Sequence, residues 1–158
     1  MLARVKQRSS SQVQKEISGV VSIRSKALTS KQLASKIAQL ADHKKAQDIV
    51  ILDMRKLVNF CDYFVLATGT SDRHAKAIAE GIDEGLSALG EHVHRGRNLK
   101  GSPTAASLDG SGAWVLLDMG DVVTHIFEPS AREFYGLEYL WQDAPSLVYK
   151  KARAKKNA

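Results

Sequence analysis

Apolar side chains recur with helical spacing in two stretches of the chain. The first stretch follows Thr29 and Ser30, either of which can cap a helix, and its apolar positions are Leu33, Ile37, Leu40 and Ala41. The second covers residues 72–89 and ends before Gly90, with apolar positions at Ala75, Ile78, Ile82, Leu86 and Leu89. Each pattern predicts a helix with one face buried in a core.

Four shorter apolar runs predict strands. Residues 48–53 form an unbroken apolar run between two aspartates, which is typical of a central strand covered on both faces, and residues 63–68 form a second run. Residues 114–118 and 122–127 are joined near Gly120 and Asp121, where a glycine suits a tight turn. The last two runs therefore predict an antiparallel hairpin.

A short helix is expected after this hairpin. Ser130 and Glu133 have the spacing of a capping box, in which two side chains satisfy backbone donors at a helix start, and Gly136 should end the helix. The apolar cluster that follows comprises Leu137, Leu140 and Trp141. Before the hairpin, residues 92–95 are a candidate short strand, and the glycines and proline of residues 96–113 predict a mobile surface loop.

These elements predict an α/β fold, a single compact domain over residues 29–145 with a mixed β-sheet flanked by helices. Residues 1–28 lack a sustained apolar period, so we expect a disordered basic extension there. Residues 146–158 are expected to form a basic C-terminal tail. The many Ser, Lys and Arg side chains of residues 1–28 are also typical of an organelle transit peptide, and that alternative stays open.

The net charge of +6 belongs to the two ends of the chain. Residues 1–30 hold six basic side chains and one acid, and residues 150–158 hold five basic side chains and no acid. Residues 31–149 hold 12 basic and 16 acidic side chains. A negative folded body disfavours a domain that reads nucleic-acid grooves, although the basic ends could contact phosphates non-specifically.

Residues 69–72 are the part of the sequence most compatible with an enzyme that binds a phosphate. Residues 69–72 lie between a predicted strand and a predicted helix, where free backbone donors could hold a phosphate, but they lack the P-loop and dinucleotide-binding patterns. A nucleotidyltransferase would need carboxylates that hold divalent metal ions, and the candidates beside Ser71 are Asp53 and Asp118. We favour helix capping by Ser71 or Asp72 and keep a nucleotide-binding or nucleotidyltransferase enzyme as the alternative.

No other pattern specifies catalysis, a metal site or a cofactor. His74 and His125 have no evident catalytic partner in the sequence. Cys61 is the single cysteine, so no internal disulfide can form, and a small buried side chain is a simpler interpretation than a nucleophile. No stretch approaches the roughly 20 apolar residues that a membrane helix needs.

Residues in the C-terminal third are better candidates for a function. Their types dominate protein interfaces, and they are Arg132 and the aromatic and apolar Trp114, Tyr135, Leu137, Tyr139 and Trp141. Core packing is the alternative for each of them. The sequence pattern leaves both interpretations open.

Four segments of the chain resemble the ribosomal silencing factor family, also called Iojap-related proteins. They are residues 45–53 (KAQDIVILD), 61–71 (CDYFVLATGTS), 114–127 (WVLLDMGDVVTHIF) and 131–141 (AREFYGLEYLW). The segments occur in the family's order and together span roughly residues 30–145. Their joint occurrence is more specific than any segment alone.

The resemblance implies a fold related to nucleotidyltransferases but without their active site. It also implies binding to the large ribosomal subunit through large-subunit protein number fourteen, which would block joining of the small subunit without any enzymatic step. The partner surface expected from the matched segments comprises Trp114, Asp118, Asp121, His125, Arg132, Tyr135, Leu137 and Trp141. The loop at residues 95–113 is longer than is usual in the family, so no function is assigned to it.

Several properties stay open at the level of sequence. The expected location is the cytoplasm, with a mitochondrion or plastid as the alternative if residues 1–28 are a transit peptide. An RNA-binding ribosome assembly factor is a further alternative, since the basic ends could reach ribosomal RNA. A homodimer of the free protein is also left open.

Overall fold

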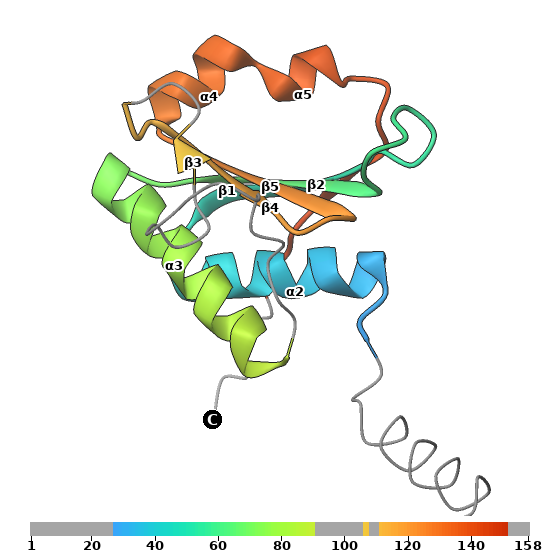
Figure 1. Ribbon diagram of the computed structural model, residues 1–158. Helices are drawn as coiled ribbons and strands as arrows, with labels where there is room; N and C mark the ends of the chain where they lie inside the picture. Colours follow the sequence, from blue (N-terminus) through green and yellow to red (C-terminus); the bar gives the residue numbers. More distant parts are fainter. Residues whose placement is uncertain (1–26, 91–105, 108–110, 152–158) are drawn as a thin grey trace, which may run out of the picture.

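The computed structural model describes residues 27–90, 106–107 and 111–151 of the chain. In this part, the elements form three layers, with a sheet in the middle, two long helices on one face and two short helices on the other (Figure 1). This arrangement confirms the predicted single α/β domain with a mixed sheet flanked by helices.

The sheet has the strand order β3-β4-β5-β2-β1-β6. The strands are β1 (Gln47–Asp53), β2 (Tyr63–Thr68), β3 (Ala106–Ser107), β4 (Trp114–Asp118), β5 (Val122–Phe127) and β6 (Ser146–Val148). The central pair β2 and β5 is parallel, and the other described pairs are antiparallel. All residues of β2 and β5 are buried, because helices cover both faces of the sheet there.

Strand β1 is covered on both faces, as its unbroken apolar run predicts. Ile51 packs into the core on the side of the long helices, and Leu52 packs into the core on the opposite side. The strand is not central, however, because it lies next to the edge strand β6. Its N-terminal part contains a bulge, where Asp48 adopts a φ of 47°.

Helix α2 (Ser30–His43) begins at the predicted place with Thr29 as its N-cap. Thr29 Oγ1 accepts a hydrogen bond from the Gln32 backbone N–H (3.2 Å), and Gln32 Oε1 accepts one from the Thr29 backbone N–H (3.0 Å). These two bonds form a capping box. The predicted buried positions are confirmed except that Leu40 is only half-buried.

Helix α3 (Asp72–Ala88) lies beside α2 on the same face of the sheet (Figure 1). Ser71 Oγ accepts a hydrogen bond from the His74 backbone N–H (3.1 Å), which confirms helix capping by Ser71. The prediction that Leu89 is buried was wrong. Leu89 is the C-cap residue and is 46% exposed, because it follows the last helical turn that faces the core.

The start of helix α4 (Pro129–Tyr135) corrects the predicted capping box. The helix begins one residue before Ser130, its N-cap is Glu128, and no side chain caps it. A proline suits the first helical position because that position needs no backbone N–H. The Glu128 N–H is already bound to the carbonyl oxygen of Ala113 (2.8 Å), which sets the chain direction at this point.

Gly136 ends α4, as predicted, and does so in a left-handed conformation with a φ of 52°. Helix α5 (Leu137–Leu140) follows directly. The two short helices therefore lie end to end across one face of the sheet (Figure 1). They carry most of the residues expected at the partner surface.

Strands β4 and β5 form the predicted hairpin, with Asp118 opposite Val123. The Met119 N–H donates to the carbonyl oxygen of Val122 (3.0 Å), and Gly120 has a φ of 78° in the turn. In the predicted loop of residues 96–113, Ala106–Ser107 form β3 against β4. The rest of that loop up to residue 110, and the candidate strand at residues 92–95, lie outside the described residues.

The sheet continues past residue 145, into the segment that the sequence assigned to the basic tail. Strand β6 pairs antiparallel with β1, and Leu147 lies opposite Ile51. The Tyr149 N–H also donates to the carbonyl oxygen of Ile49 (3.1 Å). The apolar run of Leu147, Val148 and Tyr149 is too short to predict a strand, so the strand depends on pairing with β1, which is distant in sequence.

Candidate functional site

A cluster of aromatic rings lies between the sheet and the layer formed by α4 and α5. We call it the ring cluster, and its members are Phe64, Trp114, His125, Phe127, Tyr135 and Trp141. Antiparallel pairing of β4 with β5 places Trp114 opposite Phe127 and next to His125. The ring of Trp114 lies 4.5 Å from that of Tyr135, 5.1 Å from Phe127 and 5.9 Å from His125, as centroid distances. The cluster therefore joins the hairpin to α4.

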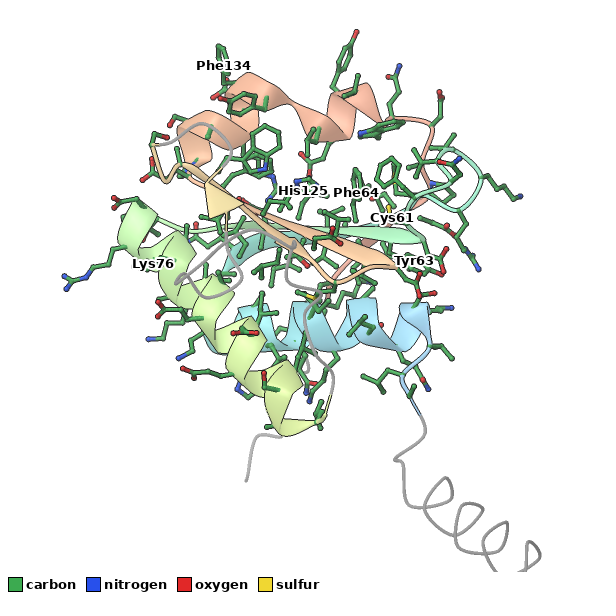
Figure 2. The ribbon with its side chains drawn as sticks, viewed as in Figure 1. Cys61, Tyr63, Phe64, Lys76, His125 and Phe134 are labelled. Carbon is green, nitrogen blue, oxygen red and sulfur yellow. The ribbon has the colours of Figure 1, made fainter. Side chains whose placement is uncertain are left out.

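His125 lies inside this cluster and not on the surface. Figure 2 shows His125 and Phe64 on the side of the sheet that faces α4 and α5, and their ring centroids are 4.7 Å apart. Trp114 Nε1 donates to His125 Nδ1 (3.2 Å), so a neutral imidazole carries its proton on Nε2. That Nε2 is buried and has no hydrogen-bond partner among the described residues.

Burial lowers the pKa of His125 to about 4, because the charged imidazolium would lose its hydration. The ring is therefore neutral at neutral pH. A buried, neutral histidine that packs among aromatic rings is better suited to a structural role than to proton transfer. His125 was expected at the partner surface, but its ring lies in the interior, beneath the surface.

Arg132 connects α4 to the sheet and to α5. Its Nη1 donates to the carbonyl oxygen of Asp48 (2.5 Å) and to Thr68 Oγ1 (2.7 Å). Its Nη2 donates to Glu138 Oε1 (2.5 Å). The Arg132 side chain is only 12% exposed, so its donors are directed into the protein. We call this set of contacts the arginine clamp.

Tyr135, Leu137 and Trp141 also face inward. All three are half-buried and pack against the core on the α4 and α5 side. Phe64 and Trp141 meet edge to face with ring centroids 6.3 Å apart. The core-packing alternative therefore accounts for a large part of each of these side chains.

Asp118 and Asp121 are the exposed members of the expected partner surface. Both lie at the turn of the hairpin, where Asp118 Oδ1 accepts a hydrogen bond from the Gly120 N–H (2.9 Å). The Asp62 N–H donates to the Asp121 carbonyl oxygen (2.7 Å), which brings a third acidic residue to this end of the sheet. The eight expected residues thus divide into two exposed carboxylates and six side chains that are wholly or partly inside.

Three exposed side chains on the outside of the same layer were missing from the expected set. Phe134 is 82% exposed, Tyr139 80% and Leu140 66%. Tyr139 was among the interface candidates and Leu140 among the apolar cluster, but neither belonged to the expected partner surface. The sequence offered no periodicity signal for these three side chains, because helices of seven and four residues make too few turns to separate a buried face from an exposed one.

The residues of the enzymatic alternative do not come together. Strand register places Asp53 opposite Tyr63 at the start of β2, at the same end of the sheet as Asp118, whereas Ser71 follows the other end of β2. Asp53 is bound by Arg55, with an Nη2 to Oδ2 distance of 2.7 Å. The hydrogen bond from Arg55 lowers the pKa of Asp53 below its ordinary value.

The remaining candidates have structural surroundings. His74 Nδ1 accepts from the Thr70 N–H (2.9 Å), and its Nε2 lies 2.7 Å from the carbonyl oxygen of Lys44, so the imidazole connects the start of α3 to the end of α2. Cys61 is buried, and desolvation raises the pKa of its thiol to about 11. In the described part of the chain, no group of His, Cys, Asp or Glu residues could hold a metal ion. None of the described helices is long and apolar enough to cross a membrane.

Comparisons with known proteins agree with the resemblance seen in the sequence. Residues 27–158 match the family model described as "Ribosomal silencing factor during starvation". The chain is 36% identical over 118 residues to "Ribosomal silencing factor RsfS" of Bacillus subtilis, covering 75% of this chain and 92% of that protein.

A mouse protein and a solved bacterial structure extend the comparison. "Mitochondrial assembly of ribosomal large subunit protein 1" of Mus musculus is 31% identical over 108 residues, covering 66% of this chain and 43% of that protein. The crystal structure of a Chromobacterium violaceum protein matches with a TM-score of 0.62 and 29% identity, covering 81% of this chain and 98% of that one. The chain therefore belongs to the ribosomal silencing factor family.

Proposed function

We propose that this protein binds the large ribosomal subunit through large-subunit protein number fourteen and blocks joining of the small subunit. The observation that carries the proposal is the family match, which includes every described helix and strand. Blocking of this kind is steric. It requires a folded body that stays on one face of the subunit, and it requires no enzymatic step.

The structure supports a binding role in two ways. The residues of the enzymatic alternative lie at opposite ends of the sheet, as Ser71 and Asp53 show. The layer of α4 and α5 is held to the sheet by the arginine clamp and the ring cluster, so it offers a preformed surface to a partner.

Sedimentation with purified ribosomal particles tests the proposal. We expect the protein to sediment with isolated large subunits but not with intact ribosomes, and to slow subunit joining measured by light scattering. Equal sedimentation with both particles, or an unchanged joining rate at saturating protein, would contradict it. The Asp53→Asn variant serves as a control for the enzymatic alternative and should behave as the wild type in both assays.

A role in assembly of the large subunit is a second candidate. It is favoured by the printed name of the mouse relative, which refers to assembly of the mitochondrial ribosomal large subunit. Depletion of the protein distinguishes the two roles. Accumulation of incomplete large subunits indicates assembly, whereas normal subunits with excess translation under starvation indicate silencing. Location in the cytoplasm, a mitochondrion or a plastid stays a prediction that depends on residues 1–28.

A further inference from the structure

The outer face of the α4 and α5 layer exposes three large apolar side chains, two of which are the most exposed large apolar side chains of the described residues. We define this outer face by Phe134, Tyr139 and Leu140, each at least 66% exposed. Figure 2 shows Phe134 pointing away from the sheet on the far side of α4. Exposed apolar side chains that are grouped on one surface, with polar neighbours, mark interaction sites more often than scattered ones do.

The backbone that presents these side chains is held in place from beneath. Phe134 rests edge to face against the ring of Tyr135 (5.1 Å between centroids), and Tyr135 packs on Trp114. On the α5 side, Glu138 is held by Arg132 next to Tyr139. Because the outer face is organised before any partner arrives, little conformational entropy would be lost on docking.

The charged side chains of α4, α5 and the segment that follows them are mainly acidic. Residues 128–149 contain four acids, namely Glu128, Glu133, Glu138 and Asp143, and one base, Arg132. The base is inside the protein and paired with Glu138. The other three carboxylates have no basic side chain in this stretch to neutralise them. Such a surface attracts a cationic partner and repels phosphates.

We propose that the outer face docks on a cationic protein surface of the large subunit that has apolar side chains at its centre, and that ribosomal RNA is not its partner. The inference deepens the proposed function and rests on it, because it names the contacting face and the chemistry of the partner. The buried ring cluster then supports the interface from behind and does not form its contact surface. Phe134, Tyr139 and Leu140 supply the apolar contacts, and Glu133 and Asp143 supply charge at the rim.

The first test removes the apolar contacts. The double variant Phe134→Ala, Leu140→Ala should bind isolated large subunits at least about tenfold more weakly, because exposed aromatic and apolar anchors carry much of an interface's affinity. Its melting midpoint should stay close to that of the wild type, since both side chains are exposed. Leu89→Ala is the matched control, because Leu89 is an exposed leucine on the layer across the sheet and should leave binding unchanged.

The second test reverses one charge at the rim. Glu133→Lys should weaken binding several-fold if the partner is cationic, whereas contact with ribosomal RNA would make binding tighter and more sensitive to salt. Tighter binding of this variant would overturn the inference in favour of RNA. Wild-type protein that fails to bind large subunits would refute the proposed function itself. Wild-type binding combined with unchanged binding of the double variant would refute the inference alone.

Discussion

The two faces of the sheet are built from different chemistry. The face under α2 and α3 is mostly aliphatic, with fully buried side chains such as Ile37, Ile78 and Ile82, although the buried ring of Tyr63 also lies there. The two helices approach closely there, since a Cβ on Gly85 would clash with a methyl carbon of Leu40. The face under α4 and α5 is aromatic and includes a histidine, an arginine clamp and many half-buried rings.

This difference indicates that the two faces of the sheet have different roles. Burial of apolar area is non-directional, so the face under α2 and α3 contributes stability without specifying a surface. Hydrogen bonds and ring contacts have preferred geometries, so the opposite face fixes where α4 and α5 lie. Substitutions on the two faces should therefore have separable effects on folding and on binding.

The largest effect on folding is expected on the aliphatic face. Ile82→Ala should lower the free energy of unfolding by about 4 kcal/mol, because it removes buried methyl groups and leaves a cavity between α3 and the sheet. Urea denaturation measures the change. At temperatures where the variant is folded, its affinity for large subunits should equal that of the wild type. A folded variant with impaired binding would contradict the division between the faces.

Trp114→Ala tests the ring cluster. We expect a loss of about 3 kcal/mol in unfolding free energy, since the indole is half-buried and packs against three other rings. Trp114→Phe keeps much of the packing but removes the hydrogen bond to His125, and should lose about 1 kcal/mol. If Trp114→Ala instead folds as stably as the wild type and no longer binds large subunits, the indole is a surface anchor.

His125 should make stability depend on pH. Its pKa is about 4 in the folded protein and near the ordinary 6.5 in the unfolded chain, so the unfolded chain binds a proton that the folded protein does not. The contribution is fully present above pH 6.5 and is lost as pH falls toward 4, by on the order of 3 kcal/mol.

Denaturation curves between about pH 5.5 and 6.5 measure this dependence, at least about one pH unit above the ordinary pKa values of aspartate (about 3.9) and glutamate (about 4.3). His125→Gln can still accept a hydrogen bond from Trp114 but does not titrate. Stability of this variant should be nearly flat over the same range. A slope equal to that of the wild type would show that another group is responsible.

Arg132→Lys should lower stability less than Ile82→Ala or Trp114→Ala does. A lysine keeps the charge but cannot reach Thr68, Asp48 and Glu138 together, so we expect a loss of about 2 kcal/mol. Binding should weaken as well, because the position of α5 depends on the clamp. Glu138→Gln keeps an acceptor for Arg132 and should bind nearly as the wild type does. If Arg132→Lys lowers stability but leaves affinity unchanged, the clamp does not position the docking surface.

The sequence by itself determined the long elements and the family of this protein. Helices α2 and α3, the hairpin of β4 and β5, and the caps at Thr29 and Ser71 follow from local periodicity and from side chains that bond to nearby backbone groups. These signals are contained within about 20 residues of chain, so no knowledge of distant neighbours is needed to see them.

The tertiary structure alone decided which side of the α4 and α5 layer faces the core. Helices of seven and four residues make too few turns for periodicity to separate a buried face from an exposed one, so Tyr135 and Trp141 could not be told from Phe134 and Tyr139. Arg132 contacts residues that lie 84 and 64 positions away in sequence. Strand β6, near the C-terminal end of the domain, pairs with β1, near its N-terminal end in sequence. Contacts of this range exist only once the sheet has assembled, because the sheet brings their partners together.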